Sequence, residues 1–183
     1  NDPQLAGMGT TCTALLIDGD CIEFAHIGDS RAYRLRPGAD GEFEQISTDH
    51  TFVQRLLNEG RITPEEAEHH PHKNVIMRVL GDVDASPELE LKTLDAVVGE
   101  RWVLSSDGLD AVVSVPEIEQ VMRSHDDLAE VADTLISMTL ERGAPDNVTV
   151  VALQVIDREE LPVDEPVGPS ALPDSALPDS IVA

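Results

Sequence analysis

A tight turn between two β-rich runs leaves few folds open to this chain. The turn is Asp18-Gly19-Asp20, and the runs on either side of it are residues 10–17 and 21–27. A short Asp-Gly turn between such runs predicts an antiparallel hairpin. A second hairpin is predicted from residues 32–35 and 42–46, which flank a Pro- and Gly-containing segment. The N-terminal part of the chain is therefore expected to form antiparallel sheet.

The first hairpin also bears on the two cysteines. If its turn is centred on Gly19, Cys21 lies opposite Ile17 and Cys12 lies opposite His26. The cysteines are then not cross-strand partners. We expect reduced thiols, which are typical of a cytosolic domain.

The spacing of apolar residues becomes helical after residue 50. Phe52 and Leu56 share one face of a predicted helix that stops at Gly60, and Thr63 to Glu66 has the spacing of a capping box. Further helices are predicted at 114–124 and 126–142, and short strands at 89–91, 102–104 and 148–155. Hairpins followed by a mixture of helices and strands indicate the α+β class.

The charge of the chain narrows its range of partners. With 12 Lys and Arg against 36 Asp and Glu, the formal net charge is −24. Such a chain is a poor ligand for nucleic acids or anionic membranes, and a good one for divalent cations or basic proteins. No apolar run is long enough to span a bilayer. After Asp157 repeated Leu-Pro-Asp-Ser units predict a disordered acidic, Pro-rich tail or linker at 158–183.

Three acidic residues stand where predicted strands begin or end. Asp29 follows one strand, Asp107 follows another, and Asp146 precedes the last. Taken singly, each fits an ordinary turn or helix cap. If the three converge, they form an oxygen-rich site suited to Mg²⁺ or Mn²⁺.

The histidines offer a competing metal site. His69, His70 and His72 suggest a transition-metal cluster, but neighbouring histidines on a helix point in different directions, and Pro71 interrupts them. A solvated helix end is the preferred interpretation over zinc binding. His26 is interpreted as a core or pocket-wall residue. For His50, helix capping and a role near the site both remain open.

No motif for a protein nucleophile occurs in the sequence. It contains no Gly-x-Ser-x-Gly elbow, no Cys-His signature and no P-loop. Ser30 and Ser106 each adjoin a candidate aspartate, which fits hydrogen bonding to a carboxylate better than nucleophilic attack.

Five short motifs occur along the chain in a recognisable order. They are Gly7-Met8-Gly9-Thr10-Thr11, the segment 27–33 with Gly28-Asp29-Ser30-Arg31, Asp49-His50, Ser105-Ser106-Asp107-Gly108-Leu109 and Asp146-Asn147. The series resembles the PP2C-type (PPM) metal-dependent protein serine/threonine phosphatases, and within them the bacterial branch. The segment 49–80 resembles the flap subdomain of that branch.

The resemblance implies a fold and a domain organisation. The fold would be a PP2C-like sandwich of two mainly antiparallel β-sheets flanked by helices, formed by residues 1–157. The family's N-terminal segment carries a phosphate-binding Arg and an Asp-Gly motif whose Asp bridges two metals. This chain begins after the place of that segment, so an N-terminally incomplete domain is expected.

The resemblance also implies a metal site. Asp107 and Asp146 match the carboxylates that hold two catalytic Mn²⁺ or Mg²⁺ ions. Asp29 matches the ligand of a third ion, and Asn74 lies where the flap can offer another ligand to that ion. A metal-activated water would attack the phosphorus of phosphoserine or phosphothreonine, and no catalytic residue beyond the metal ligands is implied.

Two functions remain open at this point. One is a phosphatase that acts on phosphorylated proteins, including serine/threonine kinases, and opposes those kinases. The other is a truncated, non-catalytic module that binds phosphoproteins or another partner. A cytoplasmic location is expected, with membrane tethering through sequence beyond the tail as an alternative.

Overall fold

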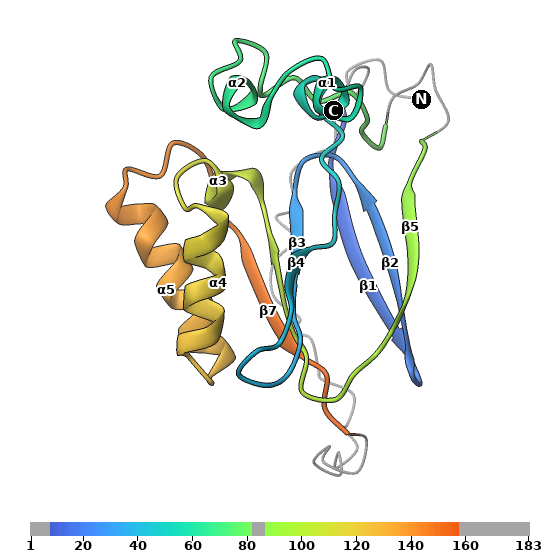
Figure 1. Cartoon of the computed structure of the whole chain (residues 1–183), viewed down its shortest axis with the longest axis vertical. Helices are drawn as coiled ribbons and strands as arrows, with labels where there is room; N and C mark the ends of the chain where they lie inside the picture. Colours follow the sequence, from blue (N-terminus) through green and yellow to red (C-terminus); the bar gives the residue numbers. More distant parts are fainter. Residues whose placement is uncertain (1–7, 82–86, 158–183) are drawn as a thin grey trace, which may run out of the picture.

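Two antiparallel β-sheets face each other in the computed structural model, which describes residues 8–81 and 87–157 (Figure 1). The predicted tail at 158–183 lies outside the described residues. The three-stranded sheet has the order β1 (Cys12–Asp18), β2 (Cys21–Ile27) and β5 (Glu90–Asp95). The four-stranded sheet has the order β4 (Phe43–Gln45), β3 (Arg31–Leu35), β6 (Arg101–Ser105) and β7 (Val150–Gln154). The prediction of an α+β sandwich of antiparallel sheets is confirmed.

The first hairpin forms, but its predicted register is wrong by one residue. Ile17 pairs with Ile22, and Cys21 pairs with Asp18. The loop therefore holds two residues, Gly19 and Asp20, rather than a turn centred on the glycine. Gly19 has φ +58°. A two-residue hairpin loop requires a positive φ at its first residue, and glycine adopts this conformation without strain. The two cysteines are free and exposed, at opposite ends of the hairpin.

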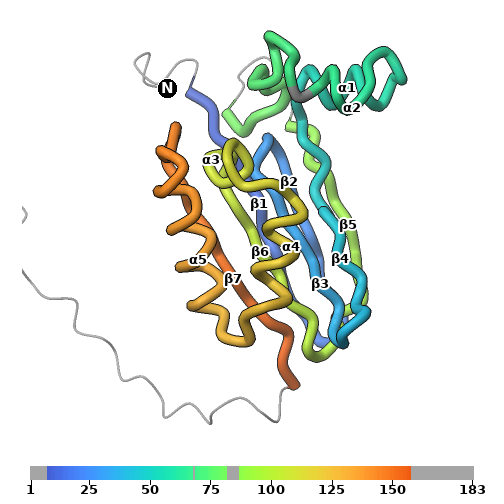
Figure 2. Tube along the Cα trace, turned by 60° about the vertical axis from the view of Figure 1, so that its left-hand side comes forward, coloured from blue at the N-terminus to red at the C-terminus, as the bar shows by residue number. Residues whose placement is uncertain are grey.

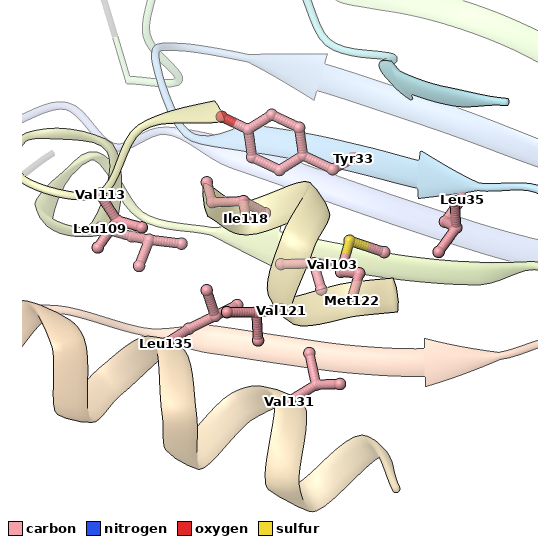
Figure 3. Packing of buried hydrophobic residues seen from close by; sticks show 10 residues of the cluster. All are labelled: Tyr33, Leu35, Val103, Leu109, Val113, Ile118, Val121, Met122, Val131 and Leu135. Atoms are coloured by element: carbon pink, nitrogen blue, oxygen red, sulfur yellow. The ribbon is translucent and has the colours of Figure 1, made fainter. Parts of the chain in front are cut away.

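The central strands β3 and β6 are covered on both faces. Ala32 and Trp102 face the other sheet, where they pack in one cluster with Phe24. Tyr33 and Val103, the next residue of each strand, face the helices in a second cluster (Figure 3). Because side chains alternate along a strand, such a strand must be apolar on both faces. This is why nearly every residue of both strands is buried.

Helices α4 (Val115–Ser124) and α5 (Leu128–Glu141) lie against the outer face of the four-stranded sheet (Figure 1). Ser114 and Glu117 form a capping box at the start of α4, and the Asp127 carboxylate caps α5 by accepting from Ala129 N–H. Residues of both helices and of α3 (Asp107–Asp110) complete the second cluster. No helix in the part of the chain that the structure describes is long and apolar enough to cross a membrane.

The predicted flap contains α1 (Phe52–Asn58) and α2 (Pro64–Glu68). Thr63 and Glu66 form the capping box expected from their spacing. Isolated bridges join Thr51 to Ile76 and Thr10 to Leu80, so the returning chain is tied to the sandwich. In both views the flap helices lie at the same end of the sandwich as α3 (Figures 1 and 2).

The packing of α5 gives a test of this architecture. Leu135 is fully buried in the helix-facing cluster, whereas Leu140 on the same helix is 59% exposed. Leu135→Ala should lower the free energy of unfolding by about 2–5 kcal/mol, because it leaves a cavity. Leu140→Ala should change it by less than about 0.5 kcal/mol. Urea denaturation measures both variants, and equal effects would contradict the packing.

Candidate metal centre

Asp29 lies in the short connection between β2 and β3. Gly28 before it has φ +115°, and a Cβ at Gly28 would lie 2.3 Å from Cγ2 of Thr11. Only glycine fits this conformation so close to a neighbouring strand. The chain can therefore turn sharply, which leaves the Asp29 side chain half-buried at the end of both sheets.

Asp107 and Asp146 come from segments that are packed together. Asp107 is the first residue of α3, directly after β6, and Asp146 lies in the loop before β7. Ser106 joins the two segments, since its N–H donates to Thr149 O and its Oγ accepts from Thr149 N–H, both at 3.0 Å. A Cβ at Gly108 would lie 2.3 Å from Asn147 O, so a glycine is required for this approach.

Asp29 and Asp107 are close enough to repel each other. Strands β3 and β6 pair with Arg31 opposite Ser105, so both aspartates flank the same end of this pair. Burial raises the pKa of Asp29, and the carboxylates of Asp107 and then Asp49 raise it further, although Arg31 opposes them. A divalent cation between two such carboxylates would relieve their repulsion. The donor set therefore fits Mg²⁺ or Mn²⁺, which take one or two carboxylates and keep several waters.

Asn74 is placed differently from the aspartates. It is exposed in the flap, between α2 and the bridge at Ile76. No contact among the described residues joins it to Asp29, Asp107 or Asp146. Its predicted role as a ligand stays a prediction.

Arg31 holds together the segments around these carboxylates. Its Nε and Nη2 donate to the Asp49 carboxylate, the closest pair being Nη2 and Oδ2 at 2.7 Å. Its Nη1 donates to Oδ1 of Asp110, which lies one turn after Asp107. Tyr33 Oη and Ser105 Oγ also donate to Asp110. The network fixes α3, and with it Asp107, relative to β3.

Among the described residues, His69, His70 and His72 do not form the three-ligand cluster that the transition-metal alternative required. The rings of His70 and His72 have centroids 5.7 Å apart and both lie beside Phe52, whereas His69 is exposed. In the described part of the chain, one group of three such ligands lies within 4.8 Å of one another, and it is His26, His50 and Glu90. The sequence offered one signal for it, the inward position of His26 on a strand, but the pairing with Glu90 was missed.

The comparison with known families identifies the class of protein. The profile of the family described as Protein phosphatase 2C matches residues 1–149, and the chain belongs to this family. The resemblance drawn from the five motifs is confirmed.

Individual relatives are named as enzymes. The chain is 48% identical over 156 residues to the serine/threonine protein phosphatase PstP of Mycobacterium tuberculosis, covering 85% of this chain and 29% of PstP. It is 36% identical over 159 residues to the protein phosphatase PhpP of Streptococcus pneumoniae, covering 86% of this chain and 63% of PhpP. These names do not favour a non-catalytic binding module.

Solved structures show the same fold. The crystal structure of M. tuberculosis PstP/Ppp matches with a TM-score of 0.78 and 47% identity, over 85% of this chain and 64% of that chain. The catalytic domain of PstP in complex with 2 manganese ions matches with a TM-score of 0.74 and 47% identity, over 85% of this chain and 63% of that one. The chain thus spans less than two thirds of the length of these relatives.

The repulsion between the two carboxylates can be measured directly. Asp107→Asn should lower the pKa of Asp29, because it removes a negative charge that disfavours ionisation of Asp29. Asp146→Asn is the matched control and should leave the Asp29 pKa unchanged, since Asp146 is not among the groups that shift it. Carboxyl ¹³C chemical shifts followed against pH in metal-free buffer report the Asp29 pKa in both variants. An unchanged Asp29 pKa in Asp107→Asn would contradict the geometry.

The Arg31 network makes a prediction about stability. Asp49 and Asp110 have side chains only 11% and 8% exposed, so removing Arg31 leaves two carboxylates without their counter-ion. Arg31→Met should lower the free energy of unfolding by roughly 2–4 kcal/mol. Arg55→Met is the control, because Arg55 is 48% exposed and its Glu59 pair spans 3.8 Å, and it should cost less than about 0.5 kcal/mol. Similar losses in the two variants by urea denaturation would count against the network.

Proposed function

We propose that the domain formed by residues 1–157 hydrolyses phosphoserine and phosphothreonine in proteins. The observation that carries this proposal is the pair of carboxylates, Asp29 and Asp107, which lie close enough to repel each other at the strand ends of a protein phosphatase 2C fold. Relatives that share this fold are named serine/threonine phosphatases, and one of them has been solved with two manganese ions.

Within this proposal each candidate residue has a role as a metal ligand. Asp107 and Asp146 would hold Mn²⁺ or Mg²⁺ as catalytic ions. Asp29 would hold a third ion together with Asp107, and Asn74 would add a ligand from the flap. When bound, such ions supply a water of lowered pKa as the nucleophile and offset the charge that grows on the phosphoryl oxygens.

The chain's own residues supply positioning rather than a nucleophile. Glycines 28 and 108 allow the two carboxylate-bearing turns to approach their neighbours closely. Arg31 keeps α3 in place through Asp110, so Asp107 presents its carboxylate from a fixed helix end. Ser106 Oγ donates to Asn147 O and accepts from Thr149 N–H, so it binds backbone groups rather than the carboxylate expected from its place beside Asp107.

The partners and location follow as further parts of the proposal. The substrates would be phosphorylated proteins, including serine/threonine kinases, and not nucleic acids, because the chain carries a net charge of −24. A cytoplasmic setting fits the free, exposed cysteines.

The decisive experiment is Mn²⁺-dependent release of phosphate from a phosphothreonine peptide by the full gene product. Asp107→Asn should abolish release, because it removes a carboxylate that the metal requires. Asp40→Asn changes the same kind of side chain on an exposed loop and should leave the rate unchanged.

Binding of Mn²⁺ provides a second readout that does not depend on turnover. Calorimetry should show Mn²⁺ binding to residues 1–183, weakened by Asp107→Asn and by Asp29→Asn. Full phosphatase activity in Asp107→Asn would refute the assignment. Metal-independent binding of phosphopeptide without turnover would instead support a binding module.

A further inference from the structure

His26 is a buried histidine with one nitrogen left unpaired. It is fully buried on the inner face of β2, and its Nδ1 lies 2.9 Å from Thr13 Oγ1. Its Nε2 has no hydrogen-bond partner among the residues that the structure describes. A buried polar atom without a partner is costly, and such atoms in native structures usually have an unseen ligand or water.

The unpaired nitrogen belongs to a group of potential metal ligands. Glu90 is the cross-strand partner of His26 on β5, and His50 follows from the segment before α1. The rings of His26 and His50 have centroids 5.0 Å apart. One ligand atom from each of the three residues lies within 4.8 Å of the others. Three separate segments thus bring their donor atoms to one place.

We propose that His26, His50 and Glu90 form a second metal site, which takes Zn²⁺ or a similar borderline transition ion. Two imidazoles and one carboxylate suit such an ion, whereas Mg²⁺ prefers an all-oxygen set like the three aspartates. Three protein ligands leave one position of a tetrahedral ion for water. The site is distinct in its donors from the carboxylate centre.

The surroundings of the two rings prepare them unequally for ligation. Thr13 Oγ1 can accept from His26 Nδ1–H, which leaves the lone pair of that ring on Nε2, as is usual for a ligating histidine. Burial lowers the pKa of both His26 and His50, which favours neutral rings. His50 accepts at Nδ1 from Gly28 N–H, and at 3.2 Å this is the longest hydrogen bond of the group. Ligation by His50 must break it, either because Nδ1 turns to the ion or because the ring proton moves to Nδ1.

Glu90 is held in place and keeps the site accessible. Its carboxylate accepts from Thr48 N–H at 2.9 Å and from Thr48 Oγ1 at 3.0 Å. Its side chain is 17% exposed, which offers the ion a path from solvent. The ammonium of Lys92 lies 2.9 Å from Glu90 Oε1 and competes with a cation for the carboxylate. Removing this ammonium should therefore strengthen metal binding.

The test is a calorimetric titration of residues 1–183 with Zn²⁺ as the only transition ion, in excess Mg²⁺ to compete for the carboxylate centre. We expect one equivalent of Zn²⁺ to bind. His26→Gln should abolish the binding, and His69→Gln, a control at an exposed histidine, should leave it unchanged. Asp107→Asn should also leave it unchanged, because that residue belongs to the other site.

The Lys92→Gln variant distinguishes an effect on the metal site from loss of the fold, because the expected result is stronger binding rather than weaker binding. It should raise the Zn²⁺ affinity roughly tenfold, since it removes a competing positive charge a few ångströms away. The amide resonance of Gly28 should shift on Zn²⁺ addition, because its bond to His50 is lost. Absence of Zn²⁺ binding, retention of binding in a folded His26→Gln variant, or weaker binding in Lys92→Gln would each overturn the proposal.

Discussion

The antiparallel pairing of β3 with β6 is the interaction on which the rest of the molecule depends. It places Arg31 opposite Ser105, so the turn after β2 and the start of α3 meet at one end of the sandwich. Both strands are buried on two faces, between the helices and the other sheet. A shift of this pairing by one residue would exchange the two buried faces and also separate Asp29 from Asp107. Core packing and the geometry of the site are thus fixed by the same ladder.

The candidate metal centre gathers several carboxylates, and a neighbouring guanidinium reduces their mutual repulsion. Asp29 is half-buried near Asp107 and Asp49, and its pKa is raised as a result. The Arg31 guanidinium offsets part of this charge by holding Asp49 and Asp110. Arg31 also lowers the pKa of Asp29, but burial and the Asp107 carboxylate outweigh it. This is the balance that a site for divalent ions requires.

Much of the molecule could be predicted because its signals are local. The Thr63–Glu66 capping box, the helix α4 and the paired strands of the second hairpin all depend on neighbouring residues. The predicted register of the first hairpin was wrong because an Asp-Gly-Asp turn can close with a loop of two or three residues, and the local sequence is compatible with both. The three aspartates could be proposed individually, but whether their turns meet depends on strand order.

The sequence by itself determined most of the elements, though not α3, together with the family and the candidate aspartates, because each rests on residue types at short spacing. Tertiary structure alone decided which groups become neighbours. It packed the Asp107 and Asp146 segments together at Gly108 and paired His26 with Glu90 across β2 and β5. His26 and Glu90 are far apart in the chain, and their approach is set by the pairing of strands, for which no local pattern exists. Sequence spacing specifies what each segment becomes, whereas long-range packing specifies which side chains share a site.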